Sequence, residues 1–409
     1  MPKSSIVHTL QERGFIHQAT DIEGLDALAC KGAISAYIGF DLTAPSLHVG
    51  SMIQLMVLRH LKAQGHTPFI LFGDATTRVG DPSDKNGLRP VLDAETIEEN
   101  RVGIVKVVDR IVGDARHVQN SEWLDEMSFM DFLQGPARGF TLNRMLTMDI
   151  VARRLEAKLP MTIMELCYSM MQGIDFAELS KWHGVRLQIG GSDQWSNILA
   201  GLDIARREGC DDLFGLTTPL MTDEQGRKMG KTAEGKAVWL SPDLVSSFDL
   251  WQFWRNVPDA KVGEFLGLFT ELPMTEVERL RALGGSEINE AKKVLATEAV
   301  AIAHGRASAE QASVTADEVF HGSGQDQGMP TFGIGIDDFH SMHLVDLAVA
   351  SGLTESKAAT RRLAAQGGLK VNGVATSDVD RPAIHMIERL PGVLSSGKKK
   401  HIRIVANYA

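Results

Sequence analysis

The chain of 409 residues has few cysteines, few tyrosines and no long apolar run. Its three cysteines, Cys30, Cys167 and Cys210, lie far apart and show no CxxC spacing, which excludes a disulfide framework and a cysteine zinc site. No apolar stretch approaches the roughly 18 residues that a membrane span needs. The first 15 residues lack the apolar core of a signal peptide. We therefore expect a cytoplasmic protein with no membrane partner and no metal site of its own.

The net charge of −10 is unevenly distributed along the chain. Residues 340–409 contain ten basic and five acidic side chains, whereas the remainder contains 32 basic and 47 acidic ones. The length leaves room for two or three domains. We expect an acidic catalytic body that carries a small basic module, although a basic tail without a partner would give the same asymmetry.

Residues 34–64 combine a strand, a turn and a helix. Ile34–Phe40 is rich in β-forming residues, and after Pro45 apolar residues recur at helical spacing. His48 and Gly50 lie at the strand-to-helix junction, where a helix N-terminus offers unpaired N–H groups to phosphate. The alternative is that Ser46 only caps the helix and His48 is a surface residue of its first turn.

A second polar loop, Gly226–Thr232, carries two lysines three residues apart. Lys228 and Lys231 could form a cationic clamp, although basic glycine-containing loops are usually just solvated. The HVGS segment at His48 and the KMGKT segment at Lys228, in this order, resemble the HIGH and KMSKS signatures of class I aminoacyl-tRNA synthetases. The fourth position of the first signature and the third position of the second differ from the consensus.

The order of elements predicts the fold class. A buried strand at residues 66–73 follows the first helix, which gives a βαβ unit and hence a parallel sheet. The class I resemblance implies that this α/β sheet is doubly wound and Rossmann-like. Polar loops after its strands carry Asp81 in GDPS and Asp193 in QIGGSDQW. Asp81 could simply form a turn before proline, and Asp193 could cap a helix. Both strings nevertheless match tyrosyl-tRNA synthetases.

Residues 127–181 read as helical and rich in methionine. Tyr168, Gln172 and Asp175 are spaced so that they share one helical face. Polar groups on an otherwise apolar helix need buried partners, unless the face is an ordinary exposed stripe. In sum, the chain is similar over its whole length to the bacterial-type tyrosyl-tRNA synthetases.

The resemblance implies the ligands of individual residues. For L-tyrosine these are Tyr37 and Asp175 at the hydroxyl, Asp81, Tyr168 and Gln172 at the ammonium group, and Gln194 near the carboxyl group. For ATP they are Asp41, His48, Gly50, Ser51, Gly191, Asp193, Lys228 and Lys231. The catalytic contacts to the phosphates come from Thr43, His48, Lys85, Arg89, Lys228 and Lys231, and Mg²⁺ is expected with ATP. Ile38 and Ser51 replace polar or histidine residues of many relatives, so nucleotide affinity is expected to differ while catalysis is retained.

The resemblance also implies a domain order. A Rossmann-like catalytic domain (1–235) contains a helical insertion (127–181) through which a homodimer is expected. An α-helical anticodon-side domain (236–320), a linker (321–337) and an S4-like RNA-binding domain of α+β type (338–409) follow. The candidate RNA-binding residues of the last domain are Lys357, Arg361, Arg362, Lys398, Lys399 and Lys400. They would track phosphates of tRNA(Tyr), and no DNA partner is expected.

The implied activity is a tyrosine–tRNA ligase, which converts tyrosine and ATP to tyrosyl-adenylate and pyrophosphate and then transfers tyrosine to the 3′ end of tRNA(Tyr). Two alternatives stay open. One is a class I synthetase for tryptophan, against which the SDQ loop and the Tyr168 face argue. The other is a catalytically inactive, synthetase-like RNA-binding protein, against which the intact His48, Lys228 and Lys231 argue.

Overall fold

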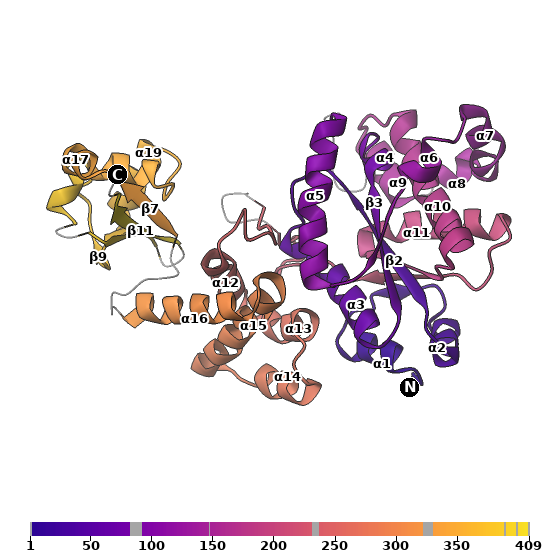
Figure 1. The fold of residues 1–409 in the computed structure, drawn as a ribbon, viewed down its shortest axis with the longest axis horizontal. Coiled ribbons are helices and arrows are strands. Elements are labelled where there is room, and N and C mark those ends of the chain that lie inside the picture. Colours follow the sequence, from indigo (N-terminus) through magenta and orange to yellow (C-terminus); the bar gives the residue numbers. More distant parts are fainter. Residues whose placement is uncertain are drawn as a thin grey trace. The chain divides into compact units, whose positions relative to one another are not determined.

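The computed structural model describes residues 2–81, 92–146, 148–230, 237–321, 330–387, 390–397 and 400–407. The chain forms two compact units (Figure 1). The first comprises Met1–Ser241 and Pro258–Ile288, and the second comprises Pro242–Val257 and Asn289–Ala409. None of the helices in the described residues is long and apolar enough to cross a membrane.

The first unit is built on a six-stranded sheet with the order β1-β6-β5-β2-β3-β4. Its strands are β1 (Gln18–Ala19), β2 (Ser35–Asp41), β3 (Thr67–Gly73), β4 (Arg116–Gln119), β5 (Leu187–Gly191) and β6 (Phe214–Thr218). Strands β2 to β6 pair in parallel, and β1 is an antiparallel edge. The strand order reverses between β2 and β5, so the doubly wound parallel sheet predicted from the sequence is confirmed.

Helices cover both faces of this sheet (Figure 1). They include α1 (Ser5–Glu12), α2 (Ile22–Lys31), α3 (Met52–Ala63), α4 (Asp74–Thr77), α5 (Ala94–Ile111), α10 (Ile163–His183) and α11 (Trp195–Arg207). Helices α3 and α5 lie on one side, and α10 and α11 lie on the other. On the second side Tyr37 and Phe69 of the sheet form one buried cluster with Phe176 of α10 and Ile198 of α11.

The segment between β4 and α10 is helical, as its sequence pattern predicts. It contains α6 (Ser121–Leu124), α7 (Phe129–Gln134), α8 (Leu142–Leu146) and α9 (Asp149–Glu156). Two later helices, α13 (Asp259–Phe269) and α14 (Met274–Arg281), belong to the same unit as the sheet. Helix α10 begins with a capping box, in which Thr162 and Glu165 exchange side-chain and backbone hydrogen bonds.

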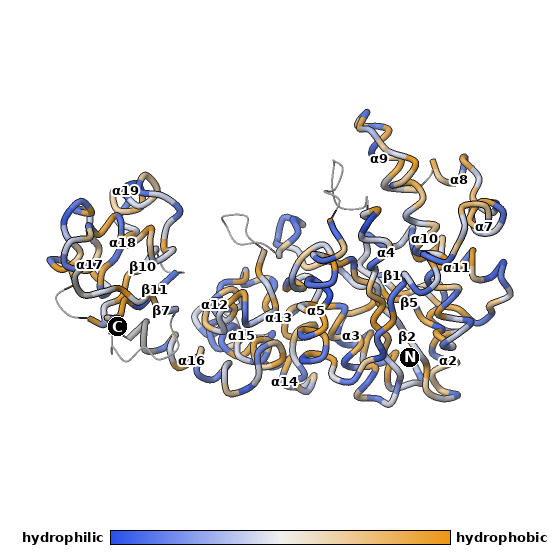
Figure 2. The backbone as a smooth tube through the Cα atoms, turned by 45° about the horizontal axis from the view of Figure 1, so that its top comes forward, coloured by the Kyte–Doolittle hydropathy of each residue, from blue (hydrophilic) through white to orange (hydrophobic). Residues whose placement is uncertain are grey.

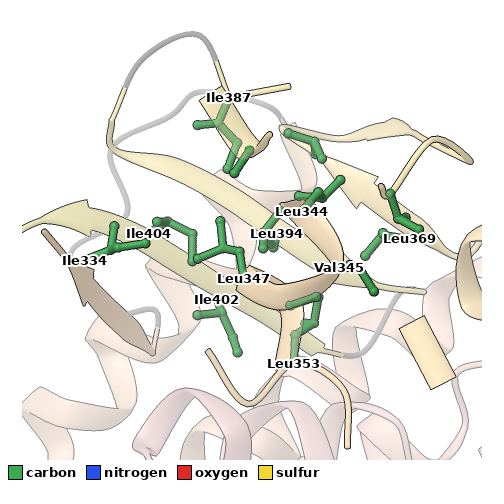
Figure 3. Close-up of a cluster of buried hydrophobic side chains, with 14 of the residues drawn as sticks. Ile334, Leu344, Val345, Leu347, Leu353, Leu369, Ile387, Leu394, Ile402 and Ile404 are labelled. Atoms are coloured by element: carbon green, nitrogen blue, oxygen red, sulfur yellow. The ribbon is translucent and has the colours of Figure 1, made fainter. Parts of the chain in front are cut away.

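The second unit joins helices to a small sheet. Its helices are α12 (Ser247–Arg255), α15 (Ile288–His304), α16 (Arg306–His321), α17 (Ile336–Ser341), α18 (Leu344–Ala350) and α19 (Lys357–Ala365). The strands β7 (Thr331–Ile334), β8 (Leu369–Val371), β9 (Val374–Ala375), β10 (Gly392–Ser396) and β11 (Lys400–Ala406) take the order β7-β11-β10-β8-β9. Leu344, Leu347, Leu394 and Ile404 pack together in the core of this α+β module (Figure 3).

Local chemistry explains two turns of the chain. Asn372 and Gly373 have φ values of 48° and 83°, and this left-handed pair closes the β8–β9 hairpin that the Asn-Gly sequence predicts. The start of α3 does not match the alternative in which Ser46 caps the helix. Ser46 does not cap the helix, because its hydroxyl donates to the carbonyl of Leu47, and a 3₁₀ turn at Val49–Ser51 precedes α3.

Candidate active site

The sheet opens at its switch point. Strands β2 and β5 pair only at Ala36–Leu187 and Tyr37–Gln188, although β2 continues to Asp41 and β5 continues to Gly191. Beyond these pairs the carboxyl ends of the two strands part. In open α/β sheets such a parting at the switch point forms the crevice in which ligands bind.

A buried phenol and a buried carboxyl group lie at the base of this region. Tyr37 is 1% exposed, and its hydroxyl has no hydrogen-bond partner among the described residues. Asp175 of α10 is 2% exposed and accepts hydrogen bonds from Asn120 Nδ2 (3.2 Å) and Trp123 Nε1 (2.9 Å). These two neutral donors orient the carboxyl group, and each of its oxygens accepts one of the two hydrogen bonds.

Burial dominates the titration of the same groups. Desolvation raises the pKa of Asp175 from 3.8 to about 7, against the lowering effect of the bonds from Trp123 and Asn120. Desolvation, together with the charge of Asp175, raises the pKa of Tyr37 well above 10. The phenol therefore stays protonated at neutral pH, and the two groups can serve one ligand hydroxyl as donor and acceptor.

A second cluster lies where β2 ends. Asp41 Oδ2 accepts from the Tyr168 hydroxyl (3.1 Å), and Asp41 Oδ1 accepts from Thr76 Oγ1 (2.9 Å). Burial, followed by the charges of Asp41 and Asp81, raises the pKa of Tyr168 well above 10. Tyr168 is therefore a neutral donor close to two carboxylates, an arrangement that favours a cationic ligand group.

The loop after β5 meets the loop after β3. Gln194 Nε2 donates to Asp81 Oδ2 at 2.8 Å, and Asn197 Nδ2 donates to Gln194 Oε1 at 3.0 Å. Gln172 is half-buried and lies one turn after Tyr168 on α10. The structure thus places Asp81, Tyr168 and Gln194 around the same end of the sheet.

Backbone pairing brings the two signature segments together. Val49 N donates to the carbonyl of Val238 (2.9 Å), and Leu240 N donates to the carbonyl of Leu47 (2.8 Å). Val238 N also donates to the carbonyl of Gly230 (2.9 Å). The segment after the KMGKT loop is thus a short antiparallel partner of the HVGS turn, and it holds the described part of that loop beside the turn.

His48 is exposed, and one of its ring nitrogens accepts a hydrogen bond from the backbone. Its Nδ1 accepts from the N–H of Gly50 at 3.0 Å, so the neutral ring carries its proton on Nε2. A Cβ at Gly230 would lie 3.7 Å from the same ring nitrogen. The Nε2 edge of His48 is thus a donor that suits an anionic ligand such as phosphate.

Lys228 and Asp193 form an ion pair. Lys228 Nζ lies 2.9 Å from Asp193 Oδ2, and the lysine side chain is half exposed. At Gly191 a Cβ would lie 2.7 Å from Asp193 Oδ1 and 3.1 Å from Leu220 Cδ2, so a larger residue at the end of β5 would have to displace the Asp193 carboxylate. The glycine leaves its backbone open to a ligand at close approach.

Other residues singled out from the sequence take no part in the hydrogen bonds and ion pairs described above. Thr43 is exposed, and Ser51 precedes α3 without a capping bond from its side chain. Ile38 is 2% exposed and packs in the sheet core. The described residues include no cluster of His, Cys, Asp and Glu that could hold a metal ion. The candidates Lys85, Arg89, Lys231, Lys398 and Lys399 lie outside the described residues.

The sequence and structure also match known proteins. The family model described as "tRNA synthetases class I (W and Y)" matches residues 29–321. The tyrosine–tRNA ligase of Rhodospirillum rubrum is 48% identical over 413 residues, which cover 98% of each chain, and that of Pseudomonas aeruginosa (strain LESB58) is 45% identical over 405 residues with the same coverage. The chain belongs to the bacterial-type tyrosyl-tRNA synthetases.

Solved structures agree with this family. A C-terminally truncated mitochondrial tyrosyl-tRNA synthetase of Aspergillus nidulans has a TM-score of 0.69 and 29% identity, over 78% of this chain and 94% of that one. The corresponding enzyme of Coccidioides posadasii has a TM-score of 0.66 and 30% identity, over 76% of this chain and 92% of that one. The class I resemblance is therefore confirmed, and tyrosine is favoured over the tryptophan alternative.

Three residues of this synthetase's site escaped the sequence analysis. Asn120 and Trp123 hold Asp175, and Thr76 holds Asp41. Asn120 directly follows β4, and polar residues at the carboxyl end of a parallel strand are a recognisable signal of a ligand site. Thr76 lies three residues after the end of β3, in the short helix α4, so the same signal applies to it.

The candidate RNA-binding residues of the synthetase differ in their surroundings. Arg361 Nη2 donates to Asp380 Oδ1 (2.6 Å), and Lys357 Nζ lies 2.5 Å from Asp346 Oδ1. Arg362 is exposed on the same helix. Lys400 Nζ donates to the carbonyls of Gly352 (2.5 Å) and Leu353 (3.2 Å). The first two pairs are exposed, so RNA phosphates could replace their carboxylates at little cost, whereas Lys400 also fastens a loop of its own module.

Proposed function

We propose that this protein activates L-tyrosine with ATP and transfers the tyrosyl group to the 3′ end of tRNA(Tyr) in the cytoplasm. The observation that carries this proposal is the buried pair of Tyr37 and Asp175. The Tyr37 hydroxyl has no partner among the described residues, and Asp175 is oriented by two donors beside it. A buried polar group left without a hydrogen bond is costly, so a ligand that brings a hydroxyl is favoured over one that does not.

The remaining groups fit the two charged ends of the amino acid. Asp81 and Asp41 supply negative charge around the Tyr168 hydroxyl, which suits an ammonium group held by Asp81, Tyr168 and Gln172. Gln194 keeps its Nε2 at Asp81, and the second N–H of that amide can donate to the substrate carboxylate. Tyrosine would thus lie with its hydroxyl at the base of the site and its carboxylate toward the HVGS turn.

The chemistry needs no nucleophile from the protein. The tyrosine carboxylate attacks the α-phosphorus of ATP, the bond to the β-phosphate oxygen breaks, and pyrophosphate leaves with its electron pair. Thr43 and the Nε2–H of His48 stabilise the phosphates, and Lys228, Lys231, Lys85 and Arg89 neutralise the leaving group. Mg²⁺ would enter with ATP as a counter-ion held mainly by phosphates and water.

The ion pair between Lys228 and Asp193 suggests how ATP arranges the site. Asp193 is the carboxylate proposed to bind the ribose, and Gly191 leaves room for the sugar against the backbone. Ribose hydroxyls at Asp193 would compete with Lys228, and the released ammonium group could turn to the phosphates. Half exposure of Lys228 keeps the cost of this exchange small.

We also propose a homodimer and a tRNA contact through the C-terminal module. Fourteen large apolar side chains are exposed among the described residues, and eight of them lie between Phe129 and Met164. Figure 2 shows apolar segments recurring along α8 and α9 in this region. Such a surface suits a subunit interface. Arg361, Arg362 and Lys357 on α19 suit RNA phosphates, in line with a catalytic, helical and S4-like domain order.

Amino-acid-dependent exchange of pyrophosphate into ATP, without tRNA, tests this function. Tyrosine, phenylalanine and tryptophan are compared in the wild type and in Asp175→Ala. Exchange with tyrosine alone, lost in the variant, is the expected result. Exchange with tryptophan would overturn the assigned substrate, and folded protein without exchange for any of the three would favour an inactive RNA-binding protein.

A further inference from the structure

A row of hydrogen bonds leads from the amino-acid site into the interior of the first unit. Gln194 Nε2 donates to Asp81 Oδ2 (2.8 Å), Asn197 Nδ2 donates to Gln194 Oε1 (3.0 Å), and Ser169 Oγ donates to Asn197 Oδ1 (2.6 Å). Ser169 is 5% exposed and Asn197 is 3% exposed. The row therefore links a proposed substrate contact to two buried side chains of α10 and α11.

Glycines in the two helices make the inner end of this row possible. A Cβ at Gly173 would lie 2.6 Å from Ile204 Cδ1 and 3.3 Å from Gly201 Cα, so α10 and α11 approach more closely than larger residues allow. Ser169 and Asn197 stand one turn before Gly173 and Gly201 in their respective helices. The close approach thus brings two short polar side chains within hydrogen-bond distance.

The carboxylate of Asp81 determines which group donates and which accepts in each hydrogen bond of the row. An ionised carboxylate only accepts hydrogen bonds, so Gln194 turns its Nε2 toward Asp81 and its Oε1 toward Asn197. Asn197 meets this oxygen with Nδ2, and its own Oδ1 accepts from Ser169. Reversal of the amide at Gln194 or Asn197 would place two acceptors against each other.

We infer that Asn197 and Ser169 are positioning residues for tyrosine binding and act through Gln194. Because Oε1 is turned toward Asn197, Gln194 directs its N–H groups to the amino-acid site, one to Asp81 and the other toward a carboxylate. Asp81 is held at the same time where it can accept from an ammonium group. This inference rests on the proposed function, because it takes Gln194 and Asp81 as contacts of the tyrosine backbone.

The test is a double-mutant cycle between Asn197→Asp and Gln194→Ala, read as KM for tyrosine and KM for ATP in pyrophosphate exchange. A carboxylate at position 197 cannot donate to Gln194 Oε1, so Asn197→Asp should raise KM for tyrosine roughly 10- to 100-fold. KM for ATP should change less than about twofold. In the Gln194→Ala background the same substitution should raise KM for tyrosine less than about twofold, because its effect passes through Gln194.

A second set of variants keeps the test decisive if the buried carboxylate of the Asn197→Asp variant prevents folding. Ser169→Ala should raise KM for tyrosine in the same direction by a smaller factor, and only while Gln194 is present, whereas Ser169→Thr keeps the hydroxyl and should restore the wild-type value. Ser180→Ala is the matched control, because Ser180 is an equally buried serine of α10 outside the row. Thermal unfolding of every variant confirms that folded proteins are compared.

The outcomes separate this inference from the proposed function. If Gln194→Ala raises KM for tyrosine but the Asn197 and Ser169 variants act equally with and without Gln194, they have only a structural role and the inference is wrong. An unchanged KM for tyrosine in both the Asn197 and Ser169 variants contradicts it as well. If the wild type does not exchange with tyrosine, the proposed function is wrong. If Gln194→Ala leaves KM for tyrosine unchanged, the proposed contact between Gln194 and the substrate is wrong.

Discussion

At the scale of single residues, the site is built from polar groups whose burial is costly until a ligand completes them. Tyr37 buries a hydroxyl without a partner among the described residues, and burial raises the pKa of Asp175 to about 7. Neither arrangement favours the folded protein by itself. Both become favourable when a ligand hydroxyl bonds to the two groups. The ligand-free protein is therefore less stable than it could be, and the site selects a ligand that carries a hydroxyl.

The raised pKa of Asp175 leads to a prediction about pH. The folded protein holds this proton more tightly than the unfolded chain, so ionisation of Asp175 makes wild-type stability fall as the pH rises from about 4 to about 7. Asp175→Asn removes that titration. Its free energy of unfolding relative to wild type should therefore improve by roughly 2 kcal/mol between pH 5 and pH 8. Urea denaturation at both pH values measures the change, and a difference that is independent of pH would contradict the raised pKa.

The sequence predicts some of these residues better than others. His48, Asp81, Asp193 and the lysines of the KMGKT loop lie in local strings whose order is informative. Asn120 and Trp123 have no such string, because their role depends on α10 passing over the end of β4. A contact between side chains 52 or 55 residues apart follows from packing and leaves no local pattern.

At the scale of elements, a buried arginine ties the end of α1 to the last turn of α13 and to the segment that joins α13 and α14. Arg13 Nη1 donates to the carbonyls of Gly267 (3.2 Å) and Thr270 (2.8 Å), and Nη2 donates to the carbonyl of Leu272 (2.5 Å). Burial lowers the pKa of Arg13, and the charges of Glu271 and Glu12 oppose this effect. The strand and helix pattern could be predicted from the sequence, but the grouping of α13 and α14 with the sheet could not, because it depends on contacts about 250 residues apart.

Arg13→Met should therefore be strongly destabilising. The substitution keeps much of the side-chain volume but leaves three carbonyl groups without their donor, which should lower the free energy of unfolding by roughly 2–4 kcal/mol. Arg279→Met on α14 is the control, because Arg279 is half exposed and pairs with Glu276 near solvent. Urea denaturation should show a large loss for the first variant and almost none for the second. Equal effects would contradict the anchoring role of Arg13.

At the scale of the whole molecule, exposed apolar residues between Phe129 and Met164 lead to a prediction about assembly. Ile163 is 80% exposed at the start of α10, and Phe129 is 73% exposed at the start of α7. Charges placed in an apolar subunit interface would be desolvated without partners. Ile163→Glu should therefore weaken the proposed dimer at least 100-fold in analytical ultracentrifugation. Val374→Glu, at an apolar residue of the C-terminal hairpin that is 70% exposed, should leave the dimer intact. A monomeric wild type would contradict the proposed interface.

The most direct test of the account is the preference of the enzyme for tyrosine over phenylalanine when the Tyr37 hydroxyl is removed. The quantity to measure is the ratio of kcat/KM for the two amino acids in pyrophosphate exchange, for wild type and Tyr37→Phe. If Tyr37 and Asp175 together recognise the substrate hydroxyl, the ratio should fall roughly 10-fold in the variant, mainly through slower use of tyrosine. An unchanged ratio in a folded, active variant would show that the substrate hydroxyl is recognised elsewhere and would contradict the central claim.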